Sequence, residues 1–191
     1  MGREIRRVPP NWQHPKTEKP NYRLGIMGER YQPMLNRAFA PAMREWIAVW
    51  EAWERGERPD YCSEESRTLQ FWEYHGGPPD PEYHRPDWKP EEMTWYQVYE
   101  TVTEGTPVTP PYATLDEIVD YLVQHGDFWD QKRRAEGVST MRCIPWPRDE
   151  AEAFVYGSGW APSMVIHDGK IMSGTEAMLA MSSNAGNHGP A

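Results

Sequence analysis

Arginine and tryptophan side chains lie close together in two segments of an otherwise acidic chain. An indole ring stacks on a nucleotide base and a guanidinium group grips phosphate, so this pairing favours nucleotide binding. Arginine beside tryptophan is also ordinary surface packing, and neither segment matches a specific motif. The candidate ligand-binding residues are Arg6, Arg7 and Trp12 in the first segment, and Trp129, Arg133, Arg134 and Trp146 in the second.

A second candidate for chemistry is an acidic loop with a histidine on either side. His75 and His84 flank Asp80 and Glu82, and Asp87 follows just beyond. Imidazoles and carboxylates at this proximity are the residue types of a metal site or an acid–base pair. A solvated loop is the favoured alternative, and we predict neither a bound metal nor a catalytic residue here.

The common catalytic and cofactor motifs are missing. The sequence has no H-E-x-x-H, no paired-cysteine zinc motif and no G-x-S-x-G. Its Gly157-Ser158-Gly159 stretch follows a predicted helix and lacks the third glycine or the lysine of a phosphate-binding loop. Cys62 and Cys143 are far apart, and we interpret both as reduced thiols. We therefore expect a non-enzymatic binding protein without a cofactor. An enzyme with a site built from dispersed histidines and carboxylates is an alternative.

The charge balance and hydropathy limit the partners. Among 191 residues, 20 Lys and Arg stand against 29 Asp and Glu, a formal net charge of -9, which disfavours DNA and RNA. No apolar run approaches the roughly 18 to 20 residues that span a bilayer, and the N-terminus lacks the apolar segment of a signal peptide. We expect no membrane association and a cytoplasmic location.

Prolines and glycines define the expected domain organisation. Five prolines interrupt residues 1–34, which predicts an irregular N-terminal arm without a long strand. Residues 35–182 are predicted to form a single α+β domain, and the small, polar residues 183–191 a frayed tail.

Several elements are indicated by local patterns. Apolar spacing predicts helices over 40–55 and 115–125, the second opened by a capping box from Thr114 to Glu117. Residues 95–102 alternate as a strand, Pro147 opens a further helix, and the polar segment 127–142 is predicted to be a solvated turn. Asp168-Gly169 predicts a hairpin over 164–172, followed by a second capping box at 173–176.

These elements predict an α+β fold with a small, mainly antiparallel sheet and three or four short helices. Trp46, Trp50 and Trp53 lie on one face of the 40–55 helix, and we interpret that stripe as buried core instead of a ligand platform.

Four stretches of sequence resemble a group of uncharacterised bacteriophage proteins. They are GREIRRVP at residues 2–9 with Trp12, EGTPV at 104–108 with GDFWD at 126–130, and GWAPSM at 159–164. The resemblance implies a phage gene product acting in the host cytoplasm. The group has no assigned activity, so it implies no catalytic residue.

The leading functional hypothesis is a phage accessory protein that binds a host protein or a small nucleotide signal, and so counteracts anti-phage defence. The alternative is a virion or assembly component, in which the N-terminal arm wraps a neighbouring subunit of a homo-oligomer.

Overall fold

The computed structural model describes residues 2–19, 28–102, 105–137, 145–167 and 169–185. The chain divides into two compact units, unit 1 comprising Met1–Pro33 with Trp88–Ala191, and unit 2 comprising Met34–Asp87. The α+β class is confirmed. The division itself differs from the predicted single body over 35–182, because the N-terminal residues pair with strands that follow residue 88 and the intervening segment packs on itself.

A four-stranded antiparallel sheet forms the centre of unit 1, in the order β7-β6-β1-β8. Its strands are β1 (Arg3–Val8), β6 (Trp95–Glu100), β7 (Thr106–Pro107) and β8 (Trp160–Ala161). Strand β1 pairs with β6 from Arg3 opposite Glu100 to Val8 opposite Trp95. The prediction that the N-terminal segment carries no long strand is therefore wrong. The many charged residues of this segment are not typical of a strand, but β1 is stabilised by pairing with β6 on one side and β8 on the other.

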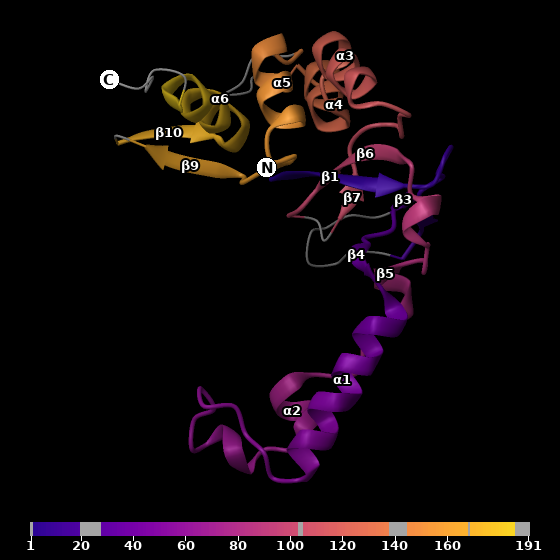
Figure 1. Cartoon of the computed structure of the whole chain (residues 1–191), viewed down its shortest axis with the longest axis vertical. Helices are drawn as coiled ribbons and strands as arrows, with labels where there is room; N and C mark the ends of the chain where they lie inside the picture. The colour runs from indigo at the N-terminus through magenta and orange to yellow at the C-terminus, as the bar shows by residue number, and fades with distance from the viewer. Residues whose placement is uncertain (1, 20–27, 103–104, 138–144, 168, 186–191) are drawn as a thin grey trace. The chain divides into compact units, whose positions relative to one another are not determined.

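Three helices of unit 1 lie together on one side of β1 and β6 (Figure 1). They are α3 (Leu115–His125), α4 (Phe128–Ala135) and α5 (Arg148–Tyr156). Their apolar faces enclose the main core with the inward side chains of the sheet. The buried members of this core are Val98, Val108, Ile118, Val119, Leu122, Trp146, Ala151, Phe154, Val155 and Ala161.

Two of the three helices in this layer, α3 and α4, begin with a capping box. The predicted capping box of α3 is present, with the Glu117 amide donating to Thr114 Oγ1 at 3.2 Å and the Thr114 amide donating to Glu117 Oε2 at 2.9 Å. The prediction of a solvated turn after residue 127 is wrong for residues 128–135, which form α4. Asp127 and Asp130 close a second, buried capping box there, and this signal could have been recognised in the sequence.

The predicted hairpin is confirmed as β9 (Met164–His167) and β10 (Lys170–Ser173), with Gly169 at a φ of 73°. Asp168 lies outside the described residues. Side chains Val165 and Met172 on one face are half-buried, whereas the other face exposes apolar side chains. The capping box at Ser173 begins α6 (Gly174–Ala185), which passes the predicted start of the tail at 183.

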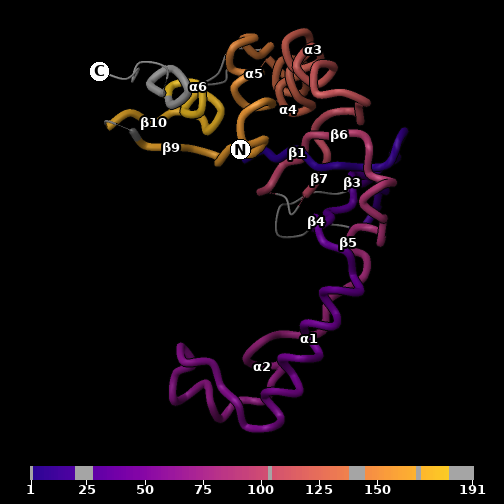
Figure 2. The backbone as a smooth tube through the Cα atoms, viewed as in Figure 1, coloured from indigo at the N-terminus to yellow at the C-terminus, as the bar shows by residue number. Residues whose placement is uncertain are grey.

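Unit 2 is built around one long helix, α1 (Phe39–Glu54), which confirms the prediction over 40–55. A short helix, α2 (Phe71–His75), lies beside it (Figures 1 and 2). Strand β4 (Leu35–Ala38) pairs in parallel with β5 (His84–Arg85), so the first and last segments of unit 2 lie side by side. The small core of the unit consists of Trp53, Cys62 and Phe71.

The remaining elements are short. Strands β2 (Lys16–Thr17) and β3 (Arg30–Tyr31) pair in unit 1, and 3-10 turns occupy Ser66–Thr68, Pro81–Tyr83 and Pro90–Glu92. The described residues form six α-helices, more than the three or four predicted, because α2 has only five residues and α4 lies in polar sequence.

Candidate functional site

Three groups of aromatic and charged side chains can be compared as candidate sites. Two lie on opposite faces of the unit 1 sheet, and one lies in unit 2. The sequence-predicted ligand residues all belong to unit 1.

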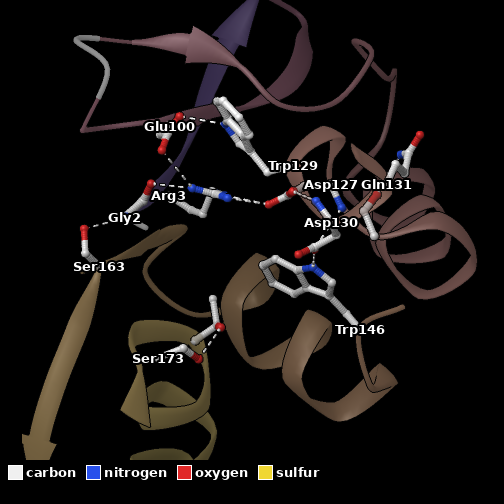
Figure 3. A network of polar contacts seen from close by, with 12 residues as sticks. Gly2, Arg3, Glu100, Asp127, Trp129, Asp130, Gln131, Trp146, Ser163 and Ser173 are labelled. Atoms are coloured by element: carbon white, nitrogen blue, oxygen red, sulfur yellow. Dashed lines mark hydrogen bonds and ion pairs between the residues drawn. The ribbon is translucent and has the colours of Figure 1, made fainter. Parts of the chain in front are cut away.

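On the helix side of the sheet, Arg3 forms the centre of a buried ionic network (Figure 3). Its Nε and Nη2 donate to Asp127 Oδ2 at 2.8 and 2.6 Å, and its Nη1 lies 3.8 Å from Glu100 Oε1. Arg3, Glu100 and Asp127 are almost completely excluded from solvent. Removing one member of a buried ion pair leaves the charge of the other member buried and uncompensated.

Two tryptophans of the predicted ligand set belong to this network (Figure 3). Trp129 Nε1 donates to Glu100 Oε2 at 2.8 Å, and Trp146 Nε1 donates to Asp130 Oδ2 at 2.8 Å. The Trp146 ring packs against Phe154 in the main core and is buried. Both indole N–H groups are thus used inside the protein, and Trp146 offers no open ring face for a ligand.

The network also fixes the position of α4 on the sheet. Asp127 caps the helix with its Oδ1, which accepts from the Asp130 amide at 2.9 Å, while its Oδ2 accepts from Arg3. A carboxylate at a helix N-terminus is additionally stabilised by the helix dipole. One side chain therefore joins the first strand to the fourth helix, so the chemistry of this group is structural. Sequence reasoning missed Arg3, Glu100 and Asp127 because their pairing spans about a hundred residues.

The opposite face of the sheet carries a second polar group, around Tyr99. Arg6 is buried, with its guanidinium 4.3 Å from the Tyr99 ring centroid, and its Nε donates to Glu4 Oε1 at 2.6 Å. Alternation along β1 places Glu4 and Arg6 on this face and Arg3 on the helix side. Arg6 is therefore already engaged by a carboxylate and by an aromatic ring of its own chain.

His14 completes this second group. Its Nε2 lies 2.6 Å from the Gln32 carbonyl oxygen and its Nδ1 lies 3.2 Å from the Tyr99 hydroxyl, which donates to Gln97 Oε1 at 2.9 Å. Burial lowers the pKa of His14 to about 4; the Gln32 carbonyl raises it and the Arg6 charge lowers it further. Burial also raises the pKa of Tyr99 to about 12. Both pKa values lie far from 7, which disfavours proton transfer by these groups at neutral pH.

The other predicted residues of unit 1 are more accessible but dispersed. Trp12 is half-buried and meets the edge of Trp88, with ring centroids 4.6 Å apart. Arg7 is exposed beside Tyr96, and Arg134 is exposed with its Nη2 3.3 Å from the His125 carbonyl oxygen. Arg133 is half-buried and makes no hydrogen bond or ion pair to the described residues. The arrangement does not join these cations into one pocket with an open ring.

The two histidines of the acidic loop are engaged separately in unit 2. His75 stacks on Phe71 with ring centroids 4.9 Å apart, and His84 Nδ1 lies 3.1 Å from the Arg37 carbonyl oxygen. Within the described residues, no group of three or more His, Cys, Asp or Glu side chains could hold a metal ion.

Unit 2 contains a connected cluster of aromatic rings. Phe71 contacts Trp46 and Trp53 at centroid distances of 5.1 and 6.1 Å. Tyr74 stacks on Trp53 at 4.6 Å, and Trp50 stacks outward on Trp46 at 6.4 Å. The i, i+4 and i+7 spacing of the tryptophans on α1 produces this arrangement directly.

The predicted burial of the tryptophan stripe holds only in part. Trp53 is 5% exposed, Trp46 is intermediate, and Trp50 is 39% exposed. The prediction is wrong for Trp50. The helix α2, which packs beside α1, has only five residues and is too short to cover the whole stripe.

Further rings of unit 2 are more exposed than Trp50. Tyr61 is 84% exposed and Trp72 is 60% exposed. Trp72 follows the buried Phe71, and Tyr61 precedes the buried Cys62 and lies close enough to Tyr74 to contribute to its raised pKa, after burial and Cys62. We call Trp50, Tyr61 and Trp72 the outer aromatic side chains of unit 2.

Comparison of the chain with protein-family models, curated proteins and solved structures finds no match. None of the helices in the described part of the chain combines the length and apolar character needed to cross a bilayer.

Proposed function

We propose that this chain is a non-enzymatic bacteriophage accessory protein that binds a host protein in the host cytoplasm and counteracts anti-phage defence. The phage assignment rests on the resemblance of residues 2–9, 104–108, 126–130 and 159–164. The binding role rests on the residues of unit 2.

The observation that carries the proposal is the exposure of Trp50, Tyr61 and Trp72 in a unit of 54 residues. Exposed Trp and Tyr side chains contribute strongly to the free energy of binding, because a large rigid ring buries much surface and loses little side-chain entropy. They are enriched at the centres of protein interfaces. A protein partner therefore accounts for side chains that unit 2 does not use in its own core.

A protein partner is preferred to a small nucleotide for a reason in unit 1. Arg6 is paired with Glu4, the Trp129 N–H group with Glu100, and Trp146 is enclosed by the core. A nucleotide that used these three side chains would have to break contacts that they already make inside the chain.

The test is affinity purification of the tagged full chain from infected cells, followed by mass spectrometry. The wild type is compared with the double variant Trp50→Ala/Trp72→Ala and with Trp160→Ala, a control that removes an exposed indole from unit 1. We expect a host protein that is retained by the wild type and the control and is lost with the double variant. Identical protein sets from all three, or a nucleotide found bound by native mass spectrometry, would contradict the proposal.

A second candidate function, a virion or assembly component, is favoured by a different surface. Met164, Ile166 and Ile171 are all more than half exposed, and the pairing of Ile166 with Ile171 places them on one face of the hairpin. An uncovered apolar face of this kind suits contact with another subunit. Mass spectrometry of purified particles tests this candidate, because a structural component is present in many copies.

A further inference from the structure

The charges of unit 2 indicate what kind of protein its outer aromatic side chains bind. Residues 34–87 contain eleven Asp and Glu side chains against six arginines, and no lysine. An interface is steered and selected by opposite charge, so a surface with this excess of carboxylates favours a cationic partner.

Most of the arginines in unit 2 already have partners within the unit. Arg37 pairs with Glu45, and Arg55 Nε donates to Glu57 Oε1 at 2.7 Å. Arg67 and Arg85 reach backbone carbonyl oxygens. These contacts pair Glu45 and Glu57 with an arginine, and the unit has nine further carboxylates.

Two of those carboxylates lie beside Trp50 on α1. Glu51 is the next residue and Glu54 lies one turn further along the same side of the helix. Both are in the last helical turn, which contains no basic side chain. Arg55 follows the helix and pairs with Glu57, and Glu51 makes a smaller contribution to the raised pKa of its guanidinium. A helix C-terminus carries partial negative charge, so carboxylates there do not serve helix stability. They do add to the attraction of a cation toward the exposed indole.

The unit itself contains an example of the contact that such a cation would make. The guanidinium of Arg58 lies 3.8 Å from the ring centroid of Trp53, and its Nη1 donates to the Trp53 carbonyl oxygen at 2.6 Å. An arginine thus stacks on an indole and binds a carbonyl group of the last turn of α1 at the same time. Trp50 lies on the same helix, and no arginine of the described residues stacks on its partly exposed ring.

We propose that the outer aromatic side chains of unit 2, with Glu51 and Glu54, bind an arginine-rich segment of the partner protein. This inference rests on the proposed function and specifies the chemistry of the partner. Arginine is preferred to lysine because the planar guanidinium stacks on indole and pairs with a carboxylate through two parallel hydrogen bonds. Exposed indole supplies the stacking surface, and the carboxylates supply charge and orientation.

The experiment measures binding of a fluorescently labelled twelve-residue peptide of alternating arginine and glycine to the full-length chain by fluorescence anisotropy. The matched peptide carries lysine at every arginine position. We expect the arginine peptide to bind about two- to fivefold more tightly than the lysine peptide, the range that stacking on exposed rings supports. Affinity should fall as salt is raised.

Variants separate a specific site from general attraction to an acidic protein. Trp50→Ala/Trp72→Ala should weaken binding of the arginine peptide about fivefold or more and abolish the preference over lysine. Glu51→Gln/Glu54→Gln should weaken both peptides and reduce the salt dependence. Trp160→Ala and Asp116→Asn, exposed positions of unit 1, are the matched controls and should change neither affinity. Circular dichroism of each variant verifies folding.

Equal affinity for the two peptides, or equal loss in the unit 1 controls, would overturn the inference. Its failure is distinct from failure of the proposed function. A host protein that is captured through Trp50 and Trp72, yet is not displaced by the arginine peptide, would contradict only the partner chemistry. Both proposals would be contradicted if the wild type bound the two peptides equally and if the double variant Trp50→Ala/Trp72→Ala still captured the same host proteins.

Discussion

Unit 1 and unit 2 use the same residue types in opposite ways. In unit 1, Arg3 and Arg6 are buried against carboxylates, and the indole N–H groups of Trp129 and Trp146 are donated to acidic side chains. In unit 2, Trp50 and Trp72 are exposed, and the last turn of α1 beside Trp50 carries two carboxylates and no basic side chain. The presence of arginine and tryptophan in the sequence therefore does not show whether these side chains are available to a ligand, because the contacts that they make in the folded chain decide it.

The largest effect is expected from breaking the Arg3 network. Arg3→Met keeps most of the apolar stem but leaves Asp127 and Glu100 buried without their cation, and should lower the free energy of unfolding by about 3 to 5 kcal/mol. Urea denaturation measures the change. Arg7→Met, on the same strand but exposed, should stay within about 0.5 kcal/mol of the wild type. Similar midpoints for the two variants would show that buried pairing does not distinguish unit 1.

The second face of the unit 1 sheet makes stability depend on pH. The folded-state pKa of His14 is about 4, below its ordinary value of 6.5, so its contribution is present above pH 6.5 and is lost as pH falls toward 4. The loss is up to about 3 kcal/mol. Tyr99 and Arg6 face the imidazole, and neither changes charge in this interval.

Denaturation midpoints of the wild type and of His14→Gln, measured from pH 7.5 to 4, isolate this contribution from that of the carboxylates. We expect the two curves to converge as the solution is acidified. Parallel curves would mean that His14 is not held neutral by its surroundings.

A smaller effect is expected at the hairpin turn, where strain is local. Gly169 has a φ of 73° and open space where a Cβ would lie, so Gly169→Val should cost about 1 kcal/mol or more through backbone conformation alone. Gly77→Val, at a glycine with equal space but no positive φ, should cost less. Thermal melting compares the two, and a larger loss for Gly77→Val would remove the turn from this account.

The smallest effect on stability is expected in the outer aromatic side chains. Trp50→Ala should lower stability by about 1 kcal/mol or less, since its ring is partly in water and contacts chiefly Trp46. Trp53→Ala, on the same helix and buried, should cost about 3 to 5 kcal/mol. A comparable loss for both would show that Trp50 is part of the core, and would erase the contrast between the units.

The sequence by itself determined the elements whose signals are local. The capping boxes at Thr114 and Ser173, the spacing along 40–55 and the Asp168-Gly169 turn each depend on residues a few positions apart, and the corresponding helices and hairpin are present. These patterns act through short-range hydrogen bonds and backbone preferences, which are the same in any fold that contains them.

Only the tertiary structure decided the roles of the charged and aromatic side chains. Strand β1 was hidden because a sequence with three arginines becomes a central strand only when Asp127, more than a hundred residues away, receives Arg3. Trp146 packs against Phe154 of α5 and is buried, whereas Trp50 stacks on Trp46 of its own helix and stays partly exposed. Burial depends on which distant segments supply partners and cover, and that information is absent from the spacing of the residues themselves.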